Sequence, residues 1–174
     1  MDNAAAEPTL ARYVATEAAI GAVINTALSA AIMHLTFGGQ ARVALWDVPG
    51  LAIDFVPQTF FLTLASALAP ALITRRRLRR GLRLRGAAGP ARPWPLPGPL
   101  WARALLLAGA ATVVCCPAMV AALAALQLDP MAYDAAMVMK CLYGALLGAV
   151  ASSVGISAVV FDAARDGAAR PLAV

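Results

Sequence analysis

Five polar side chains lie in or beside the apolar runs of this sequence and have the chemistry to bind a ligand or carry a proton: Asn25, His34, Asp54, Gln58 and Lys140. Asp54 and Gln58 are four residues apart and therefore share one face of a helix. An ionisable group inside a membrane span indicates function by default, because its burial in hydrocarbon costs free energy. Threaded as helices, the chain brings His34, Asp54 and Lys140 to a similar depth near one membrane face. The five residues are our candidate site for a proton or a small polar ligand.

The same side chains also have a structural interpretation, which the sequence leaves open. Residues 55–74 and 141–161 are each about 20 residues long, which at 1.5 Å per residue is enough to cross the hydrocarbon without Asp54 or Lys140. Those two side chains would then face the interface as a staple between helices, since a lysine can extend its ammonium to water. Asn25 would fix the register of its helix through an interhelical hydrogen bond.

Motifs of enzymes and metal proteins are missing from the sequence. It has one histidine, no metal-ligand spacing of His, Cys, Asp or Glu, no nucleophile beside a base and no glycine-rich phosphate loop. Three cysteines lie in apolar runs, and the adjacent pair Cys115 and Cys116 is not the Cys-x-x-Cys motif of a thiol oxidoreductase. We therefore expect no enzymatic activity, no metal and no cofactor.

The composition explains what must position these side chains. The 174 residues are 61% hydrophobic and 13% charged, and the mean hydropathy is +0.76, which is too apolar for an ordinary soluble domain. Such a chain has room for about four membrane spans. The sequence predicts an all-α integral membrane four-helix bundle, a single transmembrane domain over residues 1–174, with spans at about 14–37, 51–74, 104–128 and 135–161.

Most of the positive charge lies in one stretch of the loop at 75–103. Lys and Arg in short loops beside the spans keep those loops in the cytoplasm, so we expect a cytoplasmic loop and an N-in/C-in topology. The net charge of +5 would suit nucleic acid, but no stacking aromatic rings are interleaved with the arginines. We expect them to bind anionic lipid headgroups instead. The arginines are Arg75, Arg76, Arg77, Arg79, Arg80, Arg83 and Arg85.

Two further features of the loops and ends concern the connections between spans. Leu78 and Leu82 share a helix face, which predicts a short helix in the headgroup layer, with a solvated tether as the alternative. The prolines between Gly86 and Pro99 predict an extended linker that joins two transmembrane hairpins. We expect Arg103 to anchor the third span at the interface and the segment from Asp162 onward to be a frayed cytoplasmic tail.

Small side chains recur at four-residue spacing in the first and fourth apolar runs. This spacing places them on one helix face, where they let a neighbouring backbone approach closely. The first face is expected to point inward, and the second is a packing ridge one turn from Lys140. The first set is Gly21, Asn25 and Ser29, and the second is Gly144, Gly148 and Ser152.

Three segments resemble a group of small four-helix bacterial inner-membrane proteins that are sometimes described as permease-like. They run from Asp54 to Phe61, from Ala69 to Leu78 and from Lys140 to Gly144. The resemblance implies a multi-pass protein of the bacterial inner membrane and implies no catalytic residue.

Two functions follow from these expectations. The first is a permease-like protein that moves a proton or a small polar solute through an outward-opening polar site. The alternative is a non-catalytic accessory or structural subunit that packs against a larger membrane protein complex. It would do so through the small-residue ridge of the fourth span and through a similar ridge of the third span, formed by Ala104, Ala108, Thr112 and Cys116. Because four helices make a narrow path, a transporter of this size is expected to form a homo-oligomer.

Overall fold

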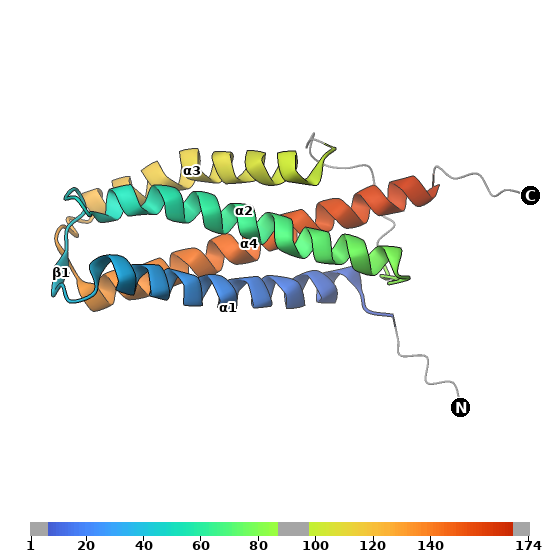
Figure 1. The fold of residues 1–174 in the computed structure, drawn as a ribbon, viewed down its shortest axis with the longest axis horizontal. Helices are drawn as coiled ribbons and strands as arrows, with labels where there is room; N and C mark the ends of the chain where they lie inside the picture. Colours follow the sequence, from blue (N-terminus) through green and yellow to red (C-terminus); the bar gives the residue numbers. More distant parts are fainter. Residues whose placement is uncertain (1–6, 87–97, 169–174) are drawn as a thin grey trace, which may run out of the picture.

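A computed structural model describes residues 7–86 and 98–168 of the chain. Four long helices run alongside one another (Figure 1), and each is long and apolar enough to cross a membrane, as in a multi-pass membrane protein. The predicted all-α class with four spans is confirmed in these terms. Most of the linker predicted from Gly86 to Pro99 lies outside the described residues. The helices are α1 (Leu10–Phe37), α2 (Leu51–Arg79), α3 (Leu100–Ala125) and α4 (Tyr133–Ala168).

Local sequence explains where the first helix begins and ends. Thr9 precedes α1, and its hydroxyl accepts a hydrogen bond from the backbone N–H of Arg12 at 3.3 Å, which satisfies one of the free donors of the first turn. Gly38 caps the other end, and Gly39 follows with φ of +90°. Only glycine adopts that backbone conformation without strain, so the chain can turn there.

The two ends of the molecule differ in their connections. At one end, β1 (Arg42–Val43) and β2 (Met131–Ala132) form a short antiparallel pair that links the α1–α2 connection to the α3–α4 connection. The backbone N–H of Leu45 also donates to the Asp129 carboxylate at 2.9 Å. We refer to this end as the hairpin end and to the opposite end, where the arginines of α2 lie, as the basic end (Figure 1).

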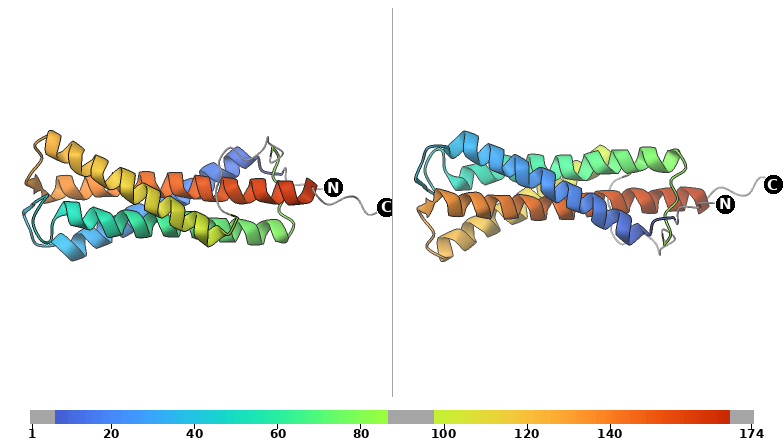
Figure 2. Two further views of the ribbon diagram at one scale, coloured as in Figure 1. Left: turned by 90° about the horizontal axis from the view of Figure 1, so that it is seen from above. Right: turned by 90° about the horizontal axis from the view of Figure 1, so that it is seen from below.

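The helices do not pack in their order along the chain. α4 packs against both α1 and α2, and α2 also packs against α3, whereas α1 barely touches α2. The order in space is therefore α1, α4, α2, α3. The hairpin of α1 and α2 is open and holds α4 between its helices, and the hairpin of α3 and α4 likewise holds α2. Figure 2 shows α1 and α3 crossing opposite faces of the central α2–α4 pair at an oblique angle.

Close packing of α1 on α4 depends on their small residues. A Cβ on Gly148 would lie 2.8 Å from the Gly21 carbonyl oxygen, and a Cβ on Gly144 would collide with the Ser29 hydroxyl. The helices thus approach each other in a fixed antiparallel register, with small side chains at each contact. The facing residues are Gly21 with Ser152, Asn25 with Gly148, and Ser29 with Gly144.

The arginine-rich stretch folds differently from both expectations. α2 continues to Arg79, five residues beyond the predicted end of the span, because arginine favours helices and cations stabilise their last turn. The chain then reverses at Gly81, which has φ of +98°, and Arg85 forms backbone hydrogen bonds to the start of α1. An independent helix through Leu78 and Leu82, and a solvated tether, are therefore both wrong for this stretch.

Candidate functional site

A buried ion pair joins α2 to α4 at the hairpin end. Asp54 lies in the first turn of α2, and its carboxylate pairs with the ammonium of Lys140. The Lys140 side chain is fully buried and that of Asp54 is 11% exposed. The ammonium nitrogen also lies 5.7 Å from the ring centre of Phe37 and 5.8 Å from that of Phe55. These distances allow cation–π attraction, so the carboxylate and two aromatic rings together stabilise the buried charge.

The depth of this pair follows from the positions of the other ion pairs. The helical rise puts Asp54 about 35 Å from Arg77 along α2, a little more than the roughly 30 Å of hydrocarbon in a bilayer. Arg77 pairs with Glu17 at 2.5 Å at the basic end. The ion pairs on α2 therefore lie near the two ends of this helix, and Asp54 and Lys140 lie at its hairpin end, inside the protein.

Hydrogen-bonded polar side chains continue from the ion pair into the bundle. One turn beyond Asp54, the Gln58 amide donates to the Ser29 hydroxyl at 2.9 Å. The next residue of α2, Thr59, shares a hydrogen bond of 2.6 Å with the Tyr143 hydroxyl and accepts a weaker one from the Cys116 thiol at 3.2 Å. All four helices thus contribute a side chain to this layer.

The polar side chains reach about the middle of the bundle and stop there. Asn25 donates to the Ser66 hydroxyl at 2.6 Å, and Ser152 donates to the Ser66 carbonyl at 3.2 Å. The helical rise puts Ser66 about 18 Å from Asp54. The next turn of α2, residues 67–70, carries only apolar side chains, and the Ala67 carbonyl packs directly on Gly155 of α4. We define the polar row as the set of buried residues Gln58, Thr59, Thr63 and Ser66 on α2.

Two atoms of the polar row lack a partner. Gln58 Oε1 and Thr63 Oγ1 are buried, and neither forms a hydrogen bond within residues 7–86 and 98–168. A buried polar atom without a partner costs about 1–3 kcal/mol. A water molecule or polar solute that donates hydrogen bonds to these atoms would recover that free energy, so the row is chemically suited to such a guest.

A groove lies on the surface of the bundle near the polar row. It has a volume of about 700 Å³, lies between α3 and α4, and carries Asp134 and Tyr143 among its lining residues. Its remaining lining side chains are largely apolar, from Met119 to Leu146. Since the Tyr143 hydroxyl is bonded to Thr59, the groove ends beside a member of the polar row.

The structure brings together only part of the predicted site. Asp54 and Lys140 are in contact and Gln58 lies one turn away, but Asn25 is bonded two turns deeper, at Ser66. His34 is exposed, and its Nδ1 lies 3.5 Å from the Tyr133 hydroxyl rather than beside the ion pair. In the part of the chain that the structure describes, no group of three His, Cys, Asp or Glu side chains could hold a metal ion.

Sequence reasoning missed two ion pairs, that of Arg77 with Glu17 and that of Arg103 with Asp162, and most of the polar row. The sequence predicts a frayed tail from Asp162 onward, but α4 continues to Ala168. The Asp162 carboxylate accepts a hydrogen bond from Arg103 at 2.7 Å, and the Arg103 side chain is buried. The prediction of a frayed tail is therefore wrong as far as Ala168, and the rest of the predicted tail lies outside the described residues. Thr59 and Thr63 are four residues apart and follow Gln58, a periodicity that already indicated a polar helix face.

Comparison of the chain with protein-family models, with curated proteins and with solved structures finds no match. The resemblance to permease-like proteins thus stays a prediction based on the quoted segments. Function must be argued from the geometry of the ion pair and the polar row.

Proposed function

We propose that this chain is a permease-like, multi-pass protein of the bacterial inner membrane that moves a proton or a small polar solute past the Asp54–Lys140 pair. The observation that carries the proposal is a fully buried lysine, paired with a carboxylate at the head of a buried polar row. Charged groups inside membrane bundles are costly and typically mark the pathways of ions and solutes.

The arginines of the basic end support an orientation. Lys and Arg beside membrane spans remain in the cytoplasm, and the last turns of α2 together with the segment up to Arg85 carry seven arginines. This orientation is N-in/C-in and directs the hairpin end, with Asp54 and Lys140, toward the outer face. The site therefore opens outward.

The chemistry of the pair suggests how a proton is coupled to a rearrangement. Protonation of Asp54 removes the charge that compensates the ammonium of Lys140, and an uncompensated buried charge costs several kcal/mol. Lys140 must then release a proton or pair with an anionic solute. Gln58 Oε1 and Thr63 Oγ1 supply acceptors further along the path, and the contact of Ala67 with Gly155 closes the half of the bundle nearest the basic end.

A flux measurement in proteoliposomes tests this function. Two fluxes are measured: the proton-linked uptake of a panel of small polar solutes, and the proton leak, which is followed with a pH-sensitive dye. Asp54→Asn and Lys140→Met are each expected to abolish both. Asp162→Asn is the matched control, because it neutralises a carboxylate of a similar ion pair at the opposite end and is expected to preserve flux. Wild-type flux in folded Asp54→Asn would refute the proposal.

An accessory role in a larger membrane complex is the alternative, and one observation supports it. α3 packs mainly along α2, and Trp101, Val113 and Val114 are exposed on it. The predicted docking ridge of α4 cannot serve, because α1 of the same chain covers Gly144 and Gly148, so that prediction is wrong. Native mass spectrometry after mild extraction distinguishes the two roles: a stoichiometric foreign subunit supports the accessory role, and a homo-oligomer supports transport.

A further inference from the structure

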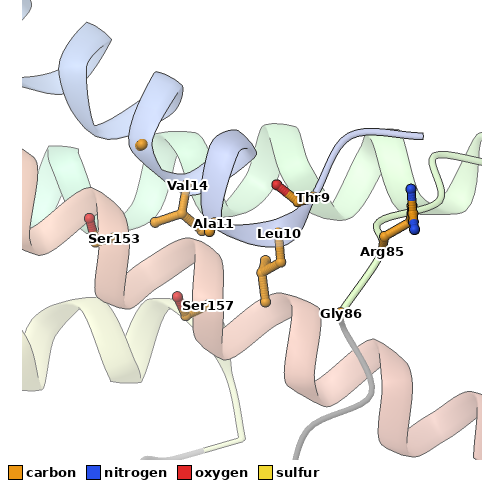
Figure 3. A pocket seen from close by; sticks show the side chains of 9 residues that line it. Thr9, Leu10, Ala11, Val14, Arg85, Gly86, Ser153 and Ser157 are labelled. Atoms are coloured by element: carbon orange, nitrogen blue, oxygen red, sulfur yellow. The ribbon is translucent and has the colours of Figure 1, made fainter. Parts of the chain in front are cut away.

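A second cavity lies at the basic end, far from the ion pair. It is a groove of about 880 Å³ between α1 and α4, within the range of about 300–1,000 Å³ that is usual for ligand sites. The first two turns of α1 form one wall and Ser153 and Ser157 of α4 form the other, with Arg85 and Gly86 at the edge (Figure 3). The groove therefore combines apolar walls with one cation.

The groove exists because α1 and α4 diverge. They are in close contact from Gly144 and Ser29 to Ser152 and Gly21, and they separate beyond Gly21 toward the basic end, as their oblique crossing shows (Figure 2). Beyond Gly21, α1 lines the groove with the larger apolar side chains of Leu10 and Val14 as well as with Ala11 and Ala15. The space is thus a result of helix packing and does not depend on the shape of a loop.

Backbone hydrogen bonds hold Arg85 at the edge of the groove. The N–H of Leu10 donates to the Arg85 carbonyl at 2.9 Å, and the N–H of Arg85 donates to the Pro8 carbonyl at 3.1 Å. The Arg85 side chain is exposed and lies beside Thr9 in Figure 3. One arginine of the basic stretch is therefore fixed relative to α1, and its guanidinium has no acidic partner among the described residues.

The hydroxyl groups of the α4 wall are not equivalent. Ser153 donates to the Ala149 carbonyl of its own helix at 2.8 Å. Ser157 has no hydrogen-bond partner in the described part of the chain and lines the groove one turn closer to the basic end. The groove thus offers a cation at its edge, a free hydroxyl on the α4 wall and an apolar surface on the α1 wall, and these three kinds of surface suit the phosphate, ester and acyl chain of a phospholipid.

We propose that this groove binds one anionic phospholipid from the leaflet at the basic end, with its phosphate on Arg85 and an acyl chain between α1 and α4. Charge complementarity selects the anionic headgroup, since a juxtamembrane arginine attracts anionic lipid. The apolar wall of Leu10 and Val14 selects an acyl chain, which a free phosphate ion lacks. The site goes beyond the ion pair of the proposed function and is independent of it.

Photo-crosslinking in vesicles tests the proposal. The full chain is reconstituted in phosphatidylcholine containing a few per cent of phosphatidylglycerol with a photoreactive group in one acyl chain, and the labelled peptides are mapped. We expect labelling concentrated on the start of α1 and on α4 around Ser157. Arg85→Gln is expected to lower it about fivefold, the change that corresponds to one juxtamembrane arginine, and Ser157→Phe is expected to block it by filling the groove.

Controls separate this site from general attraction of lipid. Arg79→Gln removes an arginine of the same stretch that does not line the groove, and it is expected to leave the labelling pattern unchanged. Labelling spread evenly over all four helices, or an equal loss in Arg79→Gln and Arg85→Gln, would overturn the proposal. Full competition by inorganic phosphate would show an anion site without a lipid, and a dimer whose groove escapes labelling would show a second copy in the groove; either result would overturn it too.

Discussion

Removing one partner of the Asp54–Lys140 pair should destabilise the protein far more than removing both. Asp54→Leu leaves the fully buried ammonium of Lys140 without a counterion, and such a change costs about 3–5 kcal/mol. Replacing a whole buried ion pair with apolar side chains is commonly neutral or stabilising by about 1–4 kcal/mol. We therefore expect Asp54→Leu/Lys140→Met to be close to wild type in its free energy of unfolding, although each single variant is not.

Unfolding of the purified protein in detergent, followed by circular dichroism, measures this cycle. A loss of 3–5 kcal/mol corresponds to a fall in Tm of roughly 6–20 °C for a chain of this length, and the double variant should recover most of it. Additivity of the single effects within about 0.5 kcal/mol would refute the buried pair. The stable double variant also distinguishes a structural role of the ion pair from a functional one. If the pair carries the proton, the double variant is expected to be folded and to show no flux.

Three further predictions concern the packing of the bundle and can be checked by the same unfolding assay. Gly148→Ala is expected to cost about 1–3 kcal/mol by overpacking the α1–α4 contact, whereas Gly109→Ala, where an added Cβ meets open space, should cost nothing. Arg103→Met should cost about 1.5–3 kcal/mol through loss of the charged hydrogen bond to Asp162, and stability equal to wild type would contradict that role. Asn25→Leu should cost about 0.6–1.7 kcal/mol, the usual range for an interhelical hydrogen bond in a membrane; no loss would mean that its bond to Ser66 is replaced.

The helices themselves could be predicted from the sequence, because length and hydropathy depend on residues close together in the chain. The four spans and the shared face of Asn25 and Ser29 follow from such local patterns. His34 shows how a local pattern can be misread. Met33 and Phe37 continue the buried face of α1, and His34 is one residue further on, about 100° around the helix, so the correct helical phase would have placed it outside the ion pair.

Contacts between distant segments could not be predicted in this way. The pairing of Arg103 with Asp162 depends on how α3 and α4 cross, and no spacing along the sequence encodes that angle. Arg85 is held by backbone groups of Pro8 and Leu10. Because nearly all residues carry the same backbone groups, the sequence does not show which of them will pair. The docking of α4 between α1 and α2 likewise depends on the fit of whole surfaces rather than on any one motif.

The central position of α4 has a consequence for biosynthesis. Half of its most apolar stretch is buried, more than in any other helix of the described chain, yet it is the last of these four helices to be synthesised. Until α4 is in place, the glycine-facing surface of α1 and the Asp54 carboxylate have no partner, and the contact of α2 with α3 is the one extensive helix contact that the described residues can form. The core of the bundle is therefore completed only when the last of its four helices is synthesised.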